Sequence, residues 1–444
     1  MNGRKIDIVL PVVLIGYFLI LLDNSVVFTS TVKIADNLNM SQDNVSWITN
    51  IYALMFGSLL LLGGRLGDVY GRKLMLIIGI AIFTLGSFMV GISVSGKMII
   101  LMRAIQGIGS SVLAPTTLAL LLDNYTGLRR QKAISYYGLT AGIGASVGII
   151  IGGIITNYLS WRWGFLINVP IGIILIFITI LFVPDNSIKE KIKLDYTGTA
   201  LSFFGFFLLV YSIDSSNYKI IKFISAIFFI SMFILVEKKN KQPLMPLELF
   251  KNRERFWAYI TRFLFAGTSI SYFFLVPQSL QQFYGYTPLM SAIAFMPETI
   301  TQFIFGMIQT KISTKLKNNS ILIIGIFINS LALILGYLIG LQHGYLIGIA
   351  IPMVILGIAQ GLAFGPLTSA GVTHTNDRIS GAASSVVNVF HQIGSSIILS
   401  IVVAYSSNLL DLNLKYNTEF LILSILGVIT LITSLNIKMN ESKS

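Results

Sequence analysis

Long apolar segments recur along the whole 444-residue chain, and they constrain its fold more than any other feature. A helix needs roughly 20 mostly apolar residues to span the hydrocarbon core of a bilayer. Only 11% of this chain is charged, against about 25% in soluble domains. We therefore predict an all-α polytopic membrane protein of fourteen transmembrane helices, with approximate limits 8–29, 46–63, 74–94, 98–122, 133–157, 163–183, 197–213, 219–236, 256–277, 289–311, 319–341, 344–370, 381–405 and 419–437.

Lysine and arginine predict how these helices are oriented. If the N-terminus is cytoplasmic, the predicted inside loops hold 23 of the 31 basic residues, the outside loops hold six, and Arg103 and Arg262 fall within spans. Cytoplasmic loops carry an excess of basic residues, so both termini are predicted to be cytoplasmic. The net charge of +13 follows from this topology and does not indicate nucleic-acid binding.

The two longest polar loops divide the chain into three parts. They cover 184–196 and 237–255 and bracket the seventh and eighth spans. We expect an N-terminal six-helix bundle over 1–183, cytoplasmic loops with two intervening helices over 184–255, and a C-terminal six-helix bundle over 256–444. Two helical halves with a site between them are a common transporter plan.

Carboxyl groups at membrane depth are the first functional candidates. Asp23 lies inside the apolar run "FLILLDNSVVFTS" (18–30), where a charge costs about 2.5–3.5 kcal/mol on insertion scales. We expect Asp23 to carry protons; the alternative is a structural pair with Arg103 or a place in a hydrogen-bond network. Glu298, after Pro297, is expected to face the bundle as a second titrating group, or else to be a simple interfacial carboxylate.

Three other polar residues within spans have structural explanations. Arg103 in "RAIQGIGSS" (103–111) either faces the interior or snorkels to the interface. Arg262, near the inner end of its span, is expected to snorkel. His391 lies beside Asn388 and Gln392 and is expected to be a hydrogen-bonded helix-packing residue.

Glycines and charges combine in two further stretches. In "GGRLGDVYGRKLML" (63–76), Gly64 allows close helix approach, Asp68 ends a span, and Gly71 permits a tight turn before Arg72 and Lys73. A plain loop obeying the positive-inside rule would explain the two basic residues equally well. In "GASVGIIIGG" (144–153), Gly144, Gly148 and Gly152 share one helix face with Gly153 beside it, which is typical of tight packing.

These stretches also carry a resemblance to a known family. The string G-x-L-x-D-x-x-G-R-K resembles the cytoplasmic loop signature of the major facilitator superfamily, which implies that Asp68 and the basic residues latch two halves together. R-x-x-Q-G-x-G in the fourth span resembles a motif of the same superfamily, implying that Arg103 influences proton transfer. "WRWGFLINVPIG" (161–172) and "LLDNSVV" are similar to strings of its fourteen-helix drug:proton antiporter family. The glycine row resembles that family's antiporter motif, with Ile149 where the motif has proline.

The resemblance implies a proton-coupled multidrug exporter of apolar, often cationic compounds that works by alternating access. Its partners would be drugs and dyes, protons and the lipid bilayer, with no nucleic acid, and a monomer is expected. The proton gradient would drive it without a cofactor, metal or catalytic residue. The candidate substrate-binding residues are Tyr52, Gln106, Phe274, Gln278 and Asn388.

The sequence also leaves two alternative hypotheses about function open. A symporter that imports a small nutrient could use the same helices and carboxylates. A membrane enzyme or sensor is the alternative of a different class, but no paired catalytic residues and no G-x-x-x-x-G-K-[ST] nucleotide motif support it.

Overall fold

The computed structural model describes residues 8–185, 194–214, 218–313, 315–375 and 377–437, which contain helices and no strands. The elements are α1 (Val9–Leu38), α2 (Gln42–Tyr70), α3 (Arg72–Gly91), α4 (Gly96–Asn124), α5 (Gly127–Tyr158), α6 (Trp161–Leu166), α7 (Asn168–Phe182), α8 (Tyr196–Asp214), α9 (Lys219–Lys239), η1 (Leu247–Phe250), α10 (Arg253–Gln282), α11 (Pro288–Ile312), α12 (Asn318–Ile339), η2 (Leu341–His343), η3 (Tyr345–Ala350), α13 (Ile351–Val372), α14 (Asp377–Ser406) and α15 (Leu412–Leu435).

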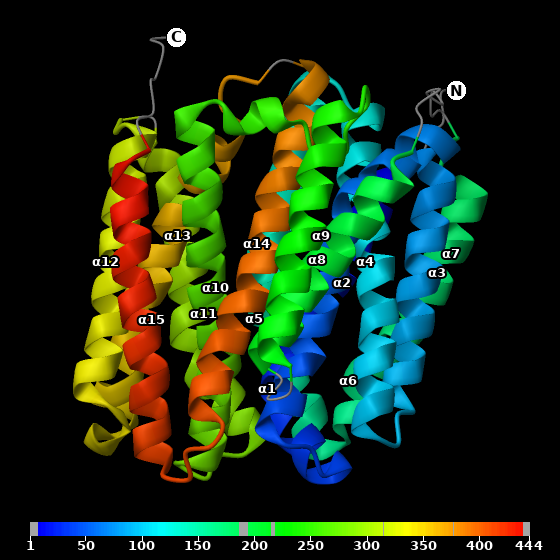
Figure 1. The fold of residues 1–444 in the computed structure, drawn as a ribbon. Coiled ribbons are helices and arrows are strands. Elements are labelled where there is room, and N and C mark those ends of the chain that lie inside the picture. Colours follow the sequence, from blue (N-terminus) through cyan, green and yellow to red (C-terminus); the bar gives the residue numbers. More distant parts are fainter. Residues whose placement is uncertain (1–7, 186–193, 215–217, 314, 376, 438–444) are drawn as a thin grey trace.

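The long helices form two groups, here called the amino-terminal group (α1–α7) and the carboxy-terminal group (α10–α15) (Figure 1). In the first, α1 packs against α5, and α4 packs against α2 and α3. In the second, α10 packs against α14, and α13 packs against α11 and α12. The groups meet where α2 contacts α14 and α5 contacts α11, and the α8–α9 pair lies against this junction through α2 and α14.

Thirteen helices among the described residues are long and apolar enough to cross a membrane, counting α6 and α7 as one segment. They coincide with thirteen of the predicted spans. The predicted span 133–157 falls in α5, whose described apolar stretch is Ser146–Tyr158. A total of fourteen crossings therefore remains a prediction.

Polar residues at the span ends set where many helices begin. Ser41, Ser95, Asn252, Thr287 and Asp411 each accept a hydrogen bond from a backbone N–H in the first turn of the helix that follows. Such caps satisfy N–H groups that have no partner within the helix. The helices thus extend past the apolar runs, since these capped ends are polar.

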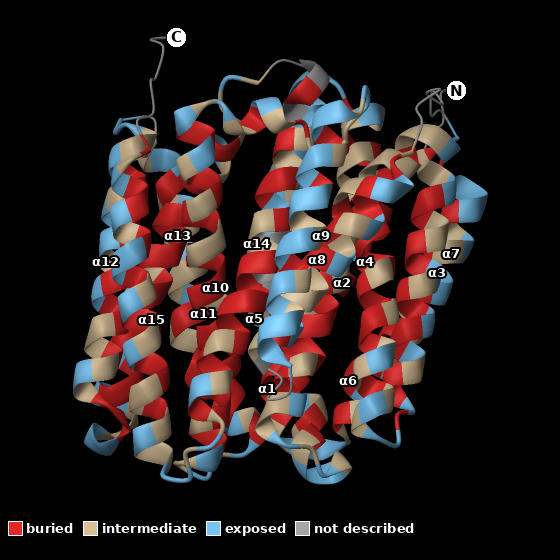
Figure 2. Cartoon of the chain, viewed as in Figure 1, coloured by how far each residue is buried: buried red, intermediate tan, exposed pale blue. Residues whose placement is uncertain are grey.

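The bundle has two ends, which are named here by the elements that lie at each. The face that holds the α2–α3 turn and the described ends Ile8 and Ile437 is called the basic face here, and the other is called the opposite face (Figure 1). Exposed residues run along the outer surfaces of the helices, whereas buried residues concentrate where helices meet (Figure 2). An apolar exposed surface along such helices is what lipid contact requires.

Candidate functional site

A large cavity separates the two helix groups. Its volume is about 1990 Å³, and α1, α2, α4 and α5 face α10, α11, α13 and α14 across it. The wall includes residues of the basic face, such as Arg65, Asp68 and Lys241, and residues at mid-depth, such as Asn24 and Phe273. The cavity therefore opens toward the basic face.

Contacts between the two groups close the cavity toward the opposite face. Gln42 Nε2 donates to Gln278 Oε1 at 2.8 Å, and Asn50 Nδ2 donates to Ser400 Oγ at 2.8 Å. Phe28 of α1 and Phe273 of α10 lie with ring centroids 5.8 Å apart, and both line the cavity. In this structure the cavity is thus open to the basic face and closed to the opposite face.

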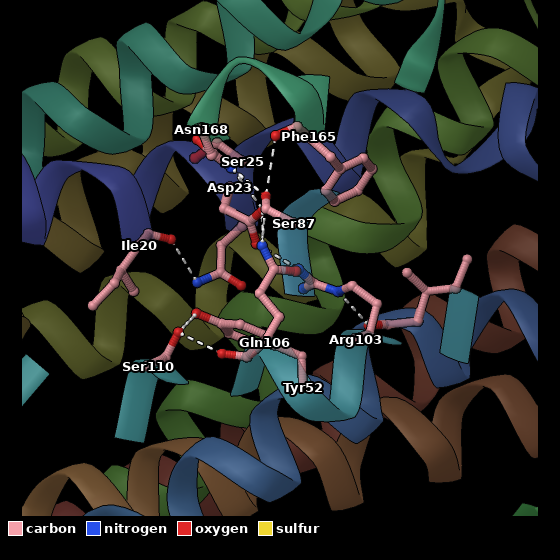
Figure 3. Close-up of polar contacts among 12 residues, drawn as sticks. Ile20, Asp23, Ser25, Tyr52, Ser87, Arg103, Gln106, Ser110, Phe165 and Asn168 are labelled. Carbon is pink, nitrogen blue, oxygen red and sulfur yellow. Dashed lines mark hydrogen bonds and ion pairs between the residues drawn. The ribbon is translucent and has the colours of Figure 1, made fainter. Parts of the chain in front are cut away.

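Asp23 lies at the centre of a polar network inside the amino-terminal group (Figure 3). The Arg103 guanidinium of α4 donates to Oδ2 of Asp23, while Gln106 Nε2 and Asn168 Nδ2 donate to Oδ1 at 2.6 and 3.2 Å. Ser87 of α3 accepts hydrogen bonds from both amides, at 3.0 and 2.8 Å. The network around this carboxylate therefore joins four helices of the group, α1, α3, α4 and α7.

The position of Arg103 is fixed on several sides. Its Nε donates to the Ile48 carbonyl at 3.1 Å, and its guanidinium lies 4.1 Å from the centroid of the Tyr52 ring. Asp23 and Arg103 are both 0% exposed, and neither belongs to the cavity wall. The structure therefore shows the paired arrangement that was the alternative for Asp23, and Arg103 faces the interior and does not snorkel.

Glu298 has a different environment in the carboxy-terminal group. It lies ten residues into α11, about 15 Å from the start of that helix, and its side chain is 0% exposed. Both of its carboxyl oxygens lack a hydrogen-bond partner among the described residues. A buried unpartnered carboxylate is very costly, so the neutral acid fits this position. The two predicted proton-coupling carboxyls thus lie in separate helix groups and are not brought together.

The residues of the 63–76 stretch form a charge cluster at the mouth of the cavity. Arg72 contacts Asp68 at 3.3 Å and Asp123 of α4 at 2.5 Å. Asp68, Arg72 and Asp123 all belong to the amino-terminal group and line the cavity. In this open arrangement, the described contacts of Asp68 and Arg72 do not reach the carboxy-terminal group, so the expected latch between halves is not formed here.

The backbone of the same stretch makes the turn between α2 and α3. Gly71 has φ 99°, a conformation that other residues rarely adopt, and Lys73 Nζ donates to the Ile180 carbonyl at 2.9 Å. Gly64 lies in the cavity wall. Arg65 of α2 donates a hydrogen bond to the carbonyl of Pro243, in the segment between α9 and α10, at 3.4 Å.

The glycine row on α5 packs directly against α1, the helix that carries Asp23. Added Cβ atoms at Gly144, Gly148 and Gly152 would lie 2.9 Å from Leu21 Cδ1, 2.7 Å from Ser25 Cβ and 2.8 Å from Val26 Cα. Gly153 faces the other group instead, where a Cβ would lie 2.5 Å from Ala292 Cβ of α11. The four glycines therefore allow close contact both within one group and between the two.

Only one of the five predicted substrate-binding residues lines the cavity. Asn388 lies in its wall, whereas Tyr52 and Gln106 are part of the Asp23 network. Phe274 is buried in the core of the carboxy-terminal group, and Gln278 belongs to the contacts that close the opposite face. In this structure these four residues therefore lie outside the cavity wall, which helix periodicity could not predict, because it does not tell which buried face opens into a cavity.

Two residues that were expected to have structural roles lie in the cavity wall. The Arg262 guanidinium lies 4.0 Å from the centroid of the Phe364 ring, and its Nη1 donates to Thr368 Oγ1 at 3.4 Å. The side chain is 2% exposed, so the snorkelling prediction is wrong. His391 packs edge-on against Phe364, but its Nδ1 has no hydrogen-bond partner among the described residues. Two sequence features could have indicated this part of the cavity wall: the charge of Arg262 within a span, and the polar Gln360 within the apolar stretch "GIAQGLAFGP".

The described residues contain no group of His, Cys, Asp and Glu that could hold a metal ion. The Major Facilitator Superfamily profile matches residues 13–399. The chain belongs to this superfamily. It is a multi-pass transport protein of the bacterial cytoplasmic membrane, with thirteen apolar helices of spanning length among the described residues.

Several superfamily relatives are similar over most of their length. Multidrug resistance protein 3 of Bacillus subtilis is 29% identical, with 86% of this chain and 76% of the relative covered. The cephamycin export protein CmcT of Amycolatopsis lactamdurans is 27% identical, covering 88% and 83%. The riboflavin transporter RibZ of Clostridioides difficile is 27% identical, covering 93% and 90%.

The fold is also similar to that of solved transporter structures. A D-xylose-proton symporter superposes with a TM-score of 0.73 over 97% of both chains, at 12% identity. This likeness supports the fold alone. The relatives are transporters of small molecules, and several are exporters or resistance proteins, which makes transport the activity of this family.

Proposed function

We propose that this chain is a proton-coupled antiporter that exports apolar, aromatic small molecules, and that it belongs to the fourteen-helix drug:proton antiporter family. The observation that carries this proposal is the cavity of about 1990 Å³ closed toward one face, with membrane-depth carboxyls buried in each helix group. Two relatives are named for multidrug resistance and for cephamycin export, which favours outward transport.

The basic face is the cytoplasmic face in this proposal. Arg65, Arg72, Lys73, Lys241 and Arg255 all lie there, which fits the positive-inside rule. The termini are then cytoplasmic, and the cavity is open inward, ready to collect compounds from the cytoplasm or the inner leaflet. Phe28, Phe56, Phe273 and Phe364 give the wall the apolar aromatic surface that such compounds need.

Proton coupling would use the two carboxyls differently. Glu298, whose carboxyl oxygens have no hydrogen-bond partner among the described residues, would hold its proton in the inward-open state. Asp23 is paired with Arg103, so a proton that reaches Asp23 must release the guanidinium and weaken the network joining α1, α3, α4 and α7. Each proton that crosses down the potential supplies about 2.3 kcal/mol per 100 mV. That energy drives export when proton and substrate occupancy exclude each other.

The glycine row would transmit this change. Gly148 touches Ser25 and Leu22, which flank Asp23 on α1, while Gly153 of the same helix touches α11 of the other group. A shift of α1 after protonation would therefore act on the junction between groups through α5. Rigid-body rocking of the groups then exposes the cavity to the opposite face.

A proton-driven importer is the second candidate, because one relative is a riboflavin transporter. Inside-out membrane vesicles test the choice with a panel of dyes. We expect respiring vesicles to accumulate dye and to lose it when a protonophore is added. Dye accumulation that survives the protonophore would contradict proton coupling, and accumulation only by right-side-out vesicles would favour import.

A further inference from the structure

Among the described residues that line the cavity, one charged side chain lies far from the mouth, and it is positive. Arg262 lies nine residues into α10, about 14 Å from the start of the helix at the basic face. The carboxylates that line the cavity, Asp68, Asp123 and Glu248, belong to its mouth, and the first two contact Arg72. Within the described part of the chain, Arg262 has no ion-pair partner.

Hydrogen-bond donors around Arg262 are also unfilled. Arg262 Nε and Gln360 Nε2 are buried without a partner among the described residues, and so is Nδ1 of His391, which a neutral imidazole can present as N–H. Gln360 lies one turn before Phe364 on α13, and the Phe364 ring contacts both Arg262 and His391. Three polar groups with unused donors thus share one stretch of cavity wall.

A buried arginine without a counter-ion is expensive in a membrane protein and marks a functional site. The guanidinium fork matches carboxylate or sulfonate oxygens in two parallel hydrogen bonds. Across the cavity, the rings of Tyr17 and Tyr137 stack with their centroids 4.1 Å apart, and both residues line the same cavity. An aromatic body would therefore have ring surfaces on both sides of the charge.

We propose that Arg262, with Gln360 and His391, forms a subsite for the anionic group of amphipathic aromatic substrates. This inference rests on the proposed export function, because it names the class of compound that the protein would export. It differs from the expectation of cationic substrates, since the deep wall offers a cation to the ligand. An anion bound here would lie between α10, α13 and α14, all from the carboxy-terminal group.

Equilibrium binding to the full-length protein in phosphatidylcholine nanodiscs tests this subsite without any gradient. The probes are anilinonaphthalene sulfonate and phenylnaphthylamine, which share one ring system and differ by the sulfonate, with empty nanodiscs subtracted. We expect Arg262→Gln to weaken sulfonate binding about tenfold, the scale of one charge-assisted hydrogen-bonded contact. Binding of the neutral amine should be unchanged.

Two further variants keep the test decisive. Arg262→Lys keeps the charge without the planar fork, so it should bind the sulfonate with intermediate affinity. Arg129→Gln removes the same charge from an exposed position outside the cavity and should bind both probes normally. Unchanged sulfonate affinity in Arg262→Gln would overturn the subsite. Equal loss of both probes would overturn it too, because Arg262 would then maintain the cavity's shape and not recognise charge.

The same measurement separates this inference from the proposed function. If charge-selective binding depends on Arg262 but no gradient-driven transport occurs, the antiporter proposal fails and the subsite stands. If dye is pumped but Arg262→Gln binds the sulfonate normally, the subsite fails and the antiporter proposal stands.

Discussion

The Arg103 guanidinium donates to the Asp23 carboxylate entirely inside the amino-terminal helix group, and neither side chain is exposed. Gln106 and Asn168 complete the shell around the carboxylate. Because the pair lies outside the cavity wall, a substrate cannot touch it in this state. Any role of Asp23 in coupling must therefore act through the helices that the network joins.

Asp23→Asn should abolish gradient-driven efflux, because asparagine nearly preserves shape but cannot carry a proton. Substrate should still bind and exchange passively. The change also leaves Arg103 buried without its counter-charge, which costs about 3–5 kcal/mol in soluble proteins. We therefore expect a lower melting temperature, measured by intrinsic fluorescence, together with the loss of pumping.

Asp36→Asn is the matched control for that variant. Asp36 is exposed near the end of the same helix, so the same chemical change there should alter neither stability nor efflux. Wild-type pumping and unchanged proton flux in Asp23→Asn would show that Asp23 is not a proton carrier and that its pair with Arg103 is structural.

Glu298→Gln should separate coupling from stability. Both carboxyl oxygens of Glu298 lack partners among the described residues, so replacing the carboxyl group by an amide breaks no described contact. We expect the melting temperature to stay at or above the wild-type value while gradient-driven efflux is lost. Dye exchange in the absence of a gradient should persist. A marked fall in melting temperature would reveal a stabilising partner and count against a free proton site.

Asp68→Ala should lower transport while leaving membrane insertion intact. In the open state, Arg72 would keep Asp123 as its partner. The substitution should therefore destabilise mainly the inward-closed state, in which the resemblance predicts that Asp68 helps to latch the two halves together. Spin labels at Leu128 and Leu316, both exposed at the basic face, report the separation of the two groups. We expect the distance distribution to shift toward the longer, inward-open separation. An unchanged distribution with normal transport would remove this role.

Gly148→Leu should abolish efflux while the protein still reaches the membrane. The added side chain would collide with Ser25 and with the α1 backbone at Leu22, 3.2 Å from the position of the new Cβ. Gly138 on the same helix has open space around it. Gly138→Ala should therefore raise thermal stability, by up to about 1 kcal/mol from helix propensity, whereas Gly148→Ala should lower it. Full activity of Gly148→Leu would show that the close contact is incidental.

The spans could be predicted from the sequence because hydrophobic length alone decides them. Predicted span 46–63 became α2 over Gln42–Tyr70, where the capped polar start and the "RLGDVY" end extend the helix beyond the apolar run. The predicted span 163–183 is divided into α6 and α7 at Ile167, next to the Asn168 that bonds to Asp23. Pro170 favours this break, because it has no backbone N–H to donate to the carbonyl four residues earlier.

The cavity wall could not be predicted in the same way. Phe274 and Phe273 are neighbours on α10, yet Phe273 lines the cavity and Phe274 is buried in the core. Which face opens depends on how the two helix groups are tilted, which is a rigid-body property of the assembled bundle. The same holds for Arg262, because an arginine near a span end has the same local sequence whether it reaches lipid headgroups or a cavity.

The direction of proton movement tests the central claim most directly. The purified protein is reconstituted into liposomes that contain a pH-sensitive dye, and a concentration gradient of a transported compound is imposed with no initial pH difference. An antiporter predicts that inward flow of the compound drives protons out and makes the lumen more alkaline, and that Asp23→Asn and Glu298→Gln abolish this response. Acidification of the lumen, or compound flux without any pH change, would contradict the account.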